Sequence, residues 1–180
     1  VIRDEAGAMS RRIQDLATRS TQALRTRWPL EDMLGADLVS AARRRIEALP
    51  GVRVAAAEVD TALWLKVDSF SLLLALASLA SRLADEYDIK LVELRLSPAG
   101  QRAHLDLVWA GQSMSTETVV SWESEPMRIG GESSALSVRD VVQRHGGEFW
   151  FERERVRHQA FFRFLLPLAG AQEQLDPATF

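Results

Sequence analysis

The stretch "SALSVRDVVQRHGGEFWF", Ser134 to Phe151, decides the fold. One helical face is formed by residues spaced i, i+3, i+4 and i+7, namely Val138, Val141, Val142 and His145. Gly146-Gly147 supplies the left-handed residue that ends such a helix, and the following "EFWF" is aromatic and strand-prone. The stretch therefore predicts a helix, a two-glycine stop and a strand.

The composition excludes several function classes. The chain has 180 residues, enough for one domain or a domain with an appendage, and 47% of them are hydrophobic, enough for a core. Its net charge of −3 gives no indication of a nucleic-acid or acidic-lipid partner. The absence of cysteine excludes disulfides and thiolate metal sites, and the three histidines are too scattered for a metal site. We therefore expect no metal, no cofactor and no direct nucleic-acid binding.

The longest apolar run, "FSLLLALASLA" from Phe70 to Ala80, is shorter than the roughly 20 residues that span a bilayer. It predicts a buried core helix. The chain begins with Val1 rather than Met, so we expect it to be a piece of a longer protein. We expect this piece to be cytoplasmic, either by itself or as the cytoplasmic part of a membrane-anchored bacterial protein.

Residues 1–28 carry a mostly apolar heptad seam, which predicts a helix that packs against another helix. The seam consists of Ile2, Ala6, Met9, Ile13 and Leu16, and continues through Ser20 and Ala23. Its partner is either a second copy of this chain, which would make a homodimer, or helix missing upstream. The simpler alternative is that this helix lies on the core of its own domain.

The remaining chain alternates between helical and strand patterns. Helices are predicted for 30–49, for 69–87 with Asp68 or Ser69 as cap, and for the helix of the opening stretch. Strands are predicted for 52–59, 63–67, 89–96, 103–109, 148–154 and 160–168. Residues 110–131 look loop-like, with a short helical piece at 116–122, and 169–180 look like a linker or tail. This order predicts an α+β two-layer sandwich.

Several of these segments resemble the C-terminal half of a sensor histidine kinase. "VIRDEAGAMSRRIQDL" is similar to the dimerisation and phosphotransfer helix of that family, and "VDSFSLLLALASLASRLA" to the helix that carries its asparagine box. "LSVRDVVQRHGGEFWFERE" followed by "FFRFLLPL" resembles the helix behind the glycine-rich lid and the last hairpin. The resemblance implies a Bergerat-type (GHKL) ATPase fold over residues 29–168, preceded by a long dimerisation helix.

The family binds the adenine amine with an aspartate in an Asp-Asn-Gly-Pro-Gly motif, and "WAGQS" stands at that place here. Trp109 takes the position of the aspartate, and an indole offers only an N–H donor, so it cannot accept from the amine. Gly111 is kept, whereas Ser113 replaces the second glycine of the motif. The adenine contact is therefore expected to be lost.

The family's magnesium ligand is an asparagine side chain, which supplies an oxygen. Ser78 and Arg82 fall on the two asparagine positions of "SLASR". A guanidinium cannot bind a cation. Arg82 is therefore expected either to touch a phosphate without metal or, as the simpler alternative, to pair with a carboxylate near the end of its helix.

The glycine-rich lid is altered as well. Glu132 and Ser134 replace the Gly-x-Gly before the last helix, although Gly130 and Gly131 survive just upstream. Glu132 would place a negative charge near the triphosphate. Three separate parts of the nucleotide site are thus replaced, each in a direction that opposes binding of Mg-ATP.

The resulting hypothesis is a non-catalytic regulatory module, a degenerate histidine-kinase-like domain that acts by dimerisation and by contacts with a partner or a neighbouring domain. The alternative is a divergent but active ATP-binding kinase or ATPase. The pattern also resembles a bacterial family in which a membrane-anchored sensory region and a kinase-like domain precede a 3′–5′ exonuclease similar to the polymerase III epsilon subunit. The closing "LDPATF" is similar to the linker into that exonuclease.

Two further clusters allow a functional interpretation. Asp140, Arg144 and His145 could form an acid–base cluster, but a histidine that caps helix carbonyls is more often structural, and we expect no catalytic residue here. "RERVRH", Arg153 to His158, is basic and falls in a predicted hairpin turn. It is either a solvated turn, the simpler reading, or a contact for a phosphate or a partner.

Overall fold

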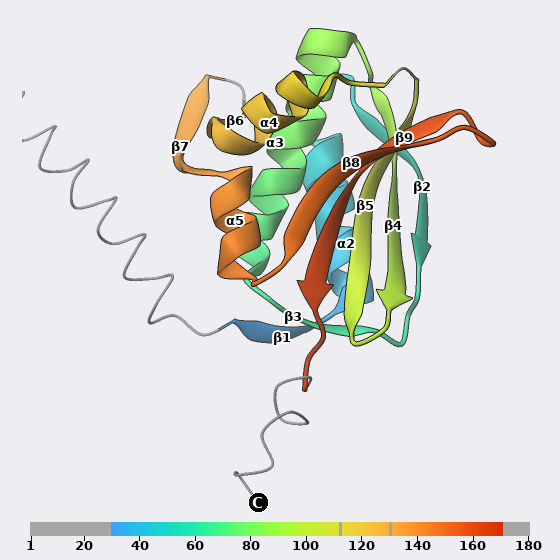
Figure 1. The fold of residues 1–180 in the computed structure, drawn as a ribbon, viewed down its shortest axis with the longest axis vertical. Helices are drawn as coiled ribbons and strands as arrows, with labels where there is room; N and C mark the ends of the chain where they lie inside the picture. The colour runs from blue at the N-terminus through green and yellow to red at the C-terminus, as the bar shows by residue number, and fades with distance from the viewer. Residues whose placement is uncertain (1–29, 112, 130, 171–180) are drawn as a thin grey trace, which may run out of the picture.

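The computed structural model describes residues 30–111, 113–129 and 131–170. These residues form two layers, a five-stranded mixed sheet and a layer of helices that covers one of its faces (Figure 1). The predicted α+β sandwich is therefore confirmed. The predicted helix at 1–28, with its seam, lies outside the described residues, as does most of the predicted tail.

The main sheet has the strand order β2-β4-β5-β9-β8. Its strands are β2 (Arg53–Val59), β4 (Leu91–Ala99), β5 (Arg102–Ala110), β8 (Glu148–Glu154) and β9 (Gln159–Pro167). β2 and β4 run parallel, and the other neighbours are antiparallel. The β4–β5 turn comes later than predicted, because Pro98 and Ala99 still pair with Ala103 and Arg102.

The helix layer contains α2 (Gly35–Glu47), α3 (Ser69–Tyr87), α4 (Thr116–Ser124) and α5 (Val138–Arg144). Asp68 is the N-cap of α3, and its carboxylate accepts a hydrogen bond from the Ser71 N–H, so the predicted cap is confirmed. Among the described residues, no helix combines the length and the apolar character needed to cross a bilayer.

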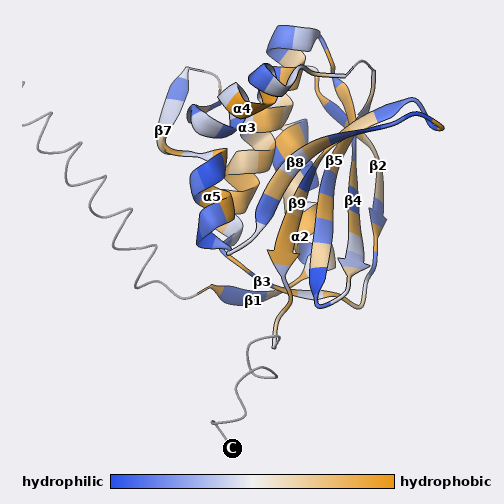
Figure 2. Cartoon of the chain, in the orientation of Figure 1, coloured by the Kyte–Doolittle hydropathy of each residue, from blue (hydrophilic) through white to orange (hydrophobic). Residues whose placement is uncertain are grey.

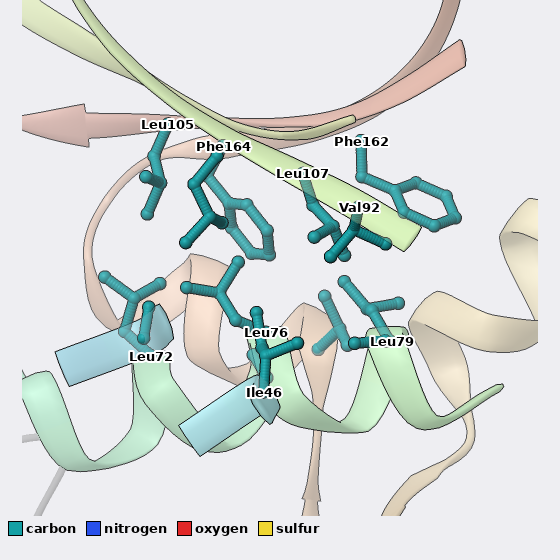
Figure 3. Close-up of a cluster of buried hydrophobic side chains, with 14 of the residues drawn as sticks. Ile46, Leu72, Leu76, Leu79, Val92, Leu105, Leu107, Phe162 and Phe164 are labelled. Carbon is teal, nitrogen blue, oxygen red and sulfur yellow. The ribbon is translucent and has the colours of Figure 1, made fainter. Parts of the chain in front are cut away.

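The core lies between the sheet and α2 and α3 (Figure 3). Alternate residues of each strand point inward, and Figure 2 shows α3 mostly in the colours of apolar residues. The labelled core residues are Ile46, Leu72, Leu76, Leu79, Val92, Leu105, Leu107, Phe162 and Phe164. The inward faces predicted for 89–96 and 103–109 are confirmed, since Val92, Leu94, Leu96, Leu105, Leu107 and Trp109 are all buried.

The predicted start of the first described helix is wrong. Residues Glu31–Leu34 form β1, which pairs antiparallel with β3 (Trp64–Val67), and α2 begins only at Gly35. The Gly35 N–H donates to the Leu63 carbonyl at 2.8 Å. Hydrogen bonds to a distant strand thus override a local helical period, which the sequence pattern could not reveal.

The segment expected to be loop-like is also more ordered than predicted. After α4 it forms a hairpin of β6 (Pro126–Ile129) and β7 (Glu132–Ser137), which we call the lid hairpin. The helix of the opening stretch starts at Val138, and the residues before it in that stretch, 134–137, belong to β7. Ser137 and Asp140 form a reciprocal capping box that fixes this start.

The two-glycine stop is confirmed and has two separate causes. Gly146 has φ +59°, the left-handed conformation that ends α5. Gly147 is required for space, because a Cβ there would lie 2.0 Å from the Leu165 carbonyl oxygen of β9. The stop thus brings β8 into register against β9.

Candidate functional site

The positions that the resemblance assigns to a nucleotide site lie on α3, at or just after the end of β5, and in the lid hairpin. In Figure 1 the lid hairpin and α4 lie beside α3, and contacts between α3 and β6 hold them there. The structure therefore brings the three altered parts together around one region of the fold.

The Trp109 side chain lies near the end of β5 and fills the space on the inner face of the sheet there. Its residue is 2% exposed, and its ring centroid lies 5.0 Å from that of Phe162 and 6.0 Å from that of Phe151. A Cβ on Gly111 would lie 3.4 Å from Cδ1 of the indole, so the ring reaches to the turn after β5. The Trp109 Nε1–H has no acceptor among the described residues, and the indole has no acceptor atom to offer to a ligand.

Three apolar residues that the sequence did not single out for this site complete the filling. Met114, Trp122 and Met127 are 8%, 3% and 2% exposed and belong to the same core cluster as Trp109. Trp122 also lies edge-on to Tyr87, with centroids 5.7 Å apart. The two methionines stand alone in polar stretches, so no periodic pattern could have found them. Trp64, by contrast, is 53% exposed.

Ser78 joins α3 to the lid hairpin. It is 2% exposed, and its Oγ accepts a hydrogen bond from the Arg128 backbone N–H at 3.2 Å. Arg128 belongs to β6. The hydroxyl is thus turned toward the lid hairpin and satisfies a donor of its backbone.

Arg82 forms a second connection across the same region. Its Nη1 donates to Glu125 Oε2 at 2.8 Å, its Nε donates to Glu86 Oε2 at 2.9 Å, and its Cζ lies 4.8 Å from the Trp122 ring centroid. Glu125 directly follows α4 and also accepts from the Ser121 hydroxyl at 2.6 Å. The prediction that Arg82 pairs with a carboxylate is confirmed.

The charges of this connection stabilise each other. Burial acts to lower the pKa of Arg82, but hydrogen bonds to Glu86 and Glu125 raise it above its ordinary value. The hydrogen bond from Ser121, together with Arg82, lowers the pKa of Glu125. The pair therefore stays ionised at neutral pH, with the guanidinium engaged by two carboxylates.

The remaining replaced positions face solvent or serve the local backbone. Ser113, Glu132, Gly111 and Gly131 are exposed. The Ser134 Oγ accepts from the Leu136 N–H at 3.1 Å, a contact within β7. Gly130 lies outside the described residues. Glu132 stands opposite Ile129 in the lid hairpin, so this segment is paired as two strands.

The Asp140, Arg144 and His145 cluster has structural contacts. His145 is 4% exposed; its Nε2 accepts from the Asp68 N–H at 2.9 Å, so its Nδ1 carries the proton and donates to the Val141 carbonyl at 2.7 Å. The Arg144 Nε lies 2.9 Å from Asp68 Oδ2. Asp140 caps α5. The cluster therefore joins the end of α5 to the start of α3.

No metal site emerges from the described ranges, in which no group of three or more His, Cys, Asp or Glu side chains converges. Next to Arg82 lies a hollow of about 230 Å³, lined by Ser81, Arg82, Asp85, Glu86, Pro126 and Arg128. Two of these side chains are acidic and two are basic, so the hollow presents no excess of charge to a triphosphate.

No protein-family model matches the chain, and no curated protein matches it by sequence. Solved structures do match it by shape. The catalytic domain of the histidine kinase ThkA aligns with a TM-score of 0.57 at 14% identity, over 77% of this chain and 95% of that one.

Two further structures agree with this match. The histidine kinase domain of the E. coli osmosensor EnvZ gives a TM-score of 0.56 at 17% identity, over 77% of this chain and 89% of that one. The ATP-binding domain of PrrB from Mycobacterium tuberculosis gives a TM-score of 0.55 at 18% identity, over 77% of this chain and 96% of that one. At such identities the likeness establishes the fold, and the chain has the fold of a histidine kinase ATPase domain.

Proposed function

We propose that this chain is a non-catalytic regulatory module, a histidine-kinase-like ATPase domain that no longer binds Mg-ATP. The observation that carries the proposal is the use of the replaced positions for internal contacts. Trp109 fills the place of the adenine carboxylate, while Ser78 and Arg82 bind the lid hairpin and the end of α4. Side chains that would have to face a nucleotide are instead part of the packed structure.

The chemistry of each replacement supports the same conclusion. The Ser78 hydroxyl is buried and accepts from a backbone N–H, while the Arg82 guanidinium has no oxygen and binds two carboxylates, so neither side chain presents an exposed oxygen ligand to magnesium. The lid segment is paired as a hairpin. Phosphates are bound by the backbone N–H groups of a glycine-rich loop, and a paired strand does not have that loop conformation.

The proposal is tested by titrating a fluorescent ATP analogue into the chain with magnesium and by following the melting temperature with Mg-ATP. We expect no saturable binding in the micromolar range and no stabilisation, because a ligand stabilises only a folded state that binds it. Micromolar binding would contradict the proposal and favour the alternative, a divergent ATP-binding kinase or ATPase.

The module would act through contacts with other protein segments. We place a homodimer contact on the seam of residues 1–28 and assign residues 29–168 to the ATPase-like domain. Histidine kinase ThkA has been solved in complex with the response regulator TrrA, and that structure aligns with a TM-score of 0.57 at 13% identity, over 93% of this chain and 51% of that one. Light scattering on residues 1–180 and on a chain that begins near Pro29 tests the seam, which predicts a dimer only for the longer chain.

We further propose that the module is the cytoplasmic, kinase-like part of a membrane-anchored bacterial protein that ends in a 3′–5′ exonuclease. The support is the resemblance of the opening stretch and of "LDPATF" to that family. The full reading frame tests it. Codons after Phe180 should soon encode a strand with an Asp-x-Glu motif, and a frame without one contradicts the idea.

A further inference from the structure

The outer face of the sheet, opposite the helices, carries a row of charges. Arg95 of β4, Asp106 of β5 and Arg163 of β9 stand opposite one another in the strand register. Arg163 donates from Nε and Nη2 to the two Asp106 oxygens, both at 2.8 Å. Asp106 is only 1% exposed although it lies on the face that no helix covers. The arginine side chains therefore shield it from water.

Phe161 orders the two guanidiniums. The Arg163 Cζ lies 4.7 Å from its ring centroid and the Arg95 Cζ lies 5.1 Å from it, so both cations contact one aromatic ring. Hydrogen bonds to Asp106 raise the pKa of Arg163 above its ordinary value, against the opposing effect of burial. The two cations are thus held close together on this face.

Beside this row lies an open hollow of about 500 Å³, which we call the arginine hollow. It is lined by Arg95, Glu152, Arg153, Glu154, Arg157, Phe161 and Arg163. The basic hairpin turn singled out in the sequence forms one side of it, and Figure 2 shows the β8–β9 connection as hydrophilic except at its tip. Four arginines face two glutamates, so positive charge exceeds negative charge even with Asp106 included.

The glutamates hold these arginines only loosely. Glu154 lies 3.9 Å from Arg95 and 3.8 Å from Arg157, and Glu152 lies 3.6 Å from Arg163. These distances exceed those of hydrogen bonds. Arg153 has no carboxylate within salt-bridge distance in the described part of the chain. Apart from the two N–H groups that Arg163 donates to Asp106, the hollow thus offers guanidinium donors that lack close carboxylate acceptors.

We propose that the arginine hollow binds a phosphate-type oxyanion. Guanidiniums approach it from β4, β8, β9 and the turn, and this arrangement suits a tetrahedral anion with several oxygens better than a planar carboxylate. A bound anion also reduces the repulsion among the four cations. The hollow lies on the opposite face from the replaced nucleotide site, so this inference is independent of the proposed function.

The test is calorimetric titration of residues 1–180, without magnesium, at low ionic strength. Inorganic phosphate is the first probe, AMP tests a phosphate ester, and citrate tests carboxylates. We expect saturable binding of phosphate or AMP and weaker binding of citrate. Binding of AMP alone assigns the site to phosphate esters, and equal binding of both probes assigns it to the free ion. No saturable binding up to about 10 mM of either probe, or tighter binding of citrate, overturns the proposal.

Variants locate the binding site. Arg153→Gln and Arg157→Gln, at exposed positions, should each weaken binding about tenfold, because each removes charged N–H donors to the anion. Glu154→Gln should tighten binding, because it removes the competing carboxylate. Arg53→Gln removes the same charge at an exposed position on β2, so it is the control and should leave the affinity unchanged. Equal affinities in all four variants would place the anion elsewhere and overturn the proposal.

Discussion

The Arg82 guanidinium meets the Glu125 carboxylate at 2.8 Å, although the two residues are 43 positions apart in the chain. Arg82 lies on α3, and Glu125 lies at the end of α4, just before the lid hairpin. The contact therefore fastens the segment that precedes the lid hairpin to α3. Ser78 adds a second attachment through the Arg128 N–H.

Loss of this contact should loosen the lid hairpin without unfolding the domain. Glu125→Gln should lower the free energy of unfolding by roughly 1 kcal/mol, because the pair is partly exposed and such pairs contribute little. Hydrogen exchange of residues 126–137 should accelerate more than that of β5. Glu47→Gln, which breaks the exposed Arg43–Glu47 pair on α2, is the control and should leave exchange in the lid hairpin unchanged. Unchanged exchange in both variants would contradict the role of Arg82 and Glu125.

Trp109 should be a main contributor to stability rather than a tolerated replacement. Trp109→Ala is expected to lower the free energy of unfolding by about 3–5 kcal/mol, since it leaves a large cavity among buried aromatic rings. Trp64→Ala is the matched control, because Trp64 is 53% exposed and should cost well under half as much. Urea denaturation measures both. Similar losses for the two variants would mean that Trp109 does not fill the site as described.

Part of this region could be predicted from the sequence, because the burial of Trp109 follows from its strand's alternation and the pairing of Arg82 with a carboxylate follows from its charge near the helix end. The apolar face and the glycine stop of the opening stretch were also predictable from spacing. The strand pairing of Glu31–Leu34 with β3, and the hairpin in place of a loop, were not, since both depend on hydrogen bonds between distant segments. Met114 and Met127 gave no signal because each stands alone in a polar stretch and is buried by segments distant in the sequence.

Gly147 should tolerate no side chain. Gly147→Ala places a Cβ 2.0 Å from the Leu165 carbonyl oxygen, so β8 must shift relative to β9, at an expected cost of at least about 2 kcal/mol. Gly131→Ala is the control, because a Cβ there meets nothing within 4 Å and its φ needs no glycine. Thermal unfolding of both variants compares them. A nearly neutral Gly147→Ala would show that the β8–β9 register is not set by this contact.

Acid should destabilise the domain through His145. Burial lowers the pKa of His145, although its bond to Val141 and the Asp68 charge act to raise it and Arg144 acts to lower it. The unfolded chain therefore takes up a proton that the folded chain refuses, so stability is full above the ordinary histidine pKa of about 6.5 and falls as pH decreases below it. A proton on Nε2 would also remove the acceptor of the hydrogen bond from the Asp68 N–H.

This pH dependence is measured by urea denaturation between about pH 8 and pH 5. His145→Gln removes the titrating group and should give a shallower dependence. Burial, with Arg163, also lowers the pKa of His104, so His104→Gln is the comparison variant. In this variant the part of the pH dependence of stability that comes from His145 should remain. An unchanged slope in His145→Gln would contradict the buried, neutral histidine.

The most direct test of the central claim is a Mg-ATP titration of residues 1–180 carrying Arg153→Gln and Arg157→Gln, which removes the proposed anion site. The lid hairpin and the Trp109 indole ring report on the replaced site by NMR. We expect no saturable shift of these signals below about 1 mM Mg-ATP, which corresponds to a binding free energy weaker than about −4 kcal/mol. Saturable shifts at micromolar Mg-ATP, centred on Trp109 and Arg82, would contradict it.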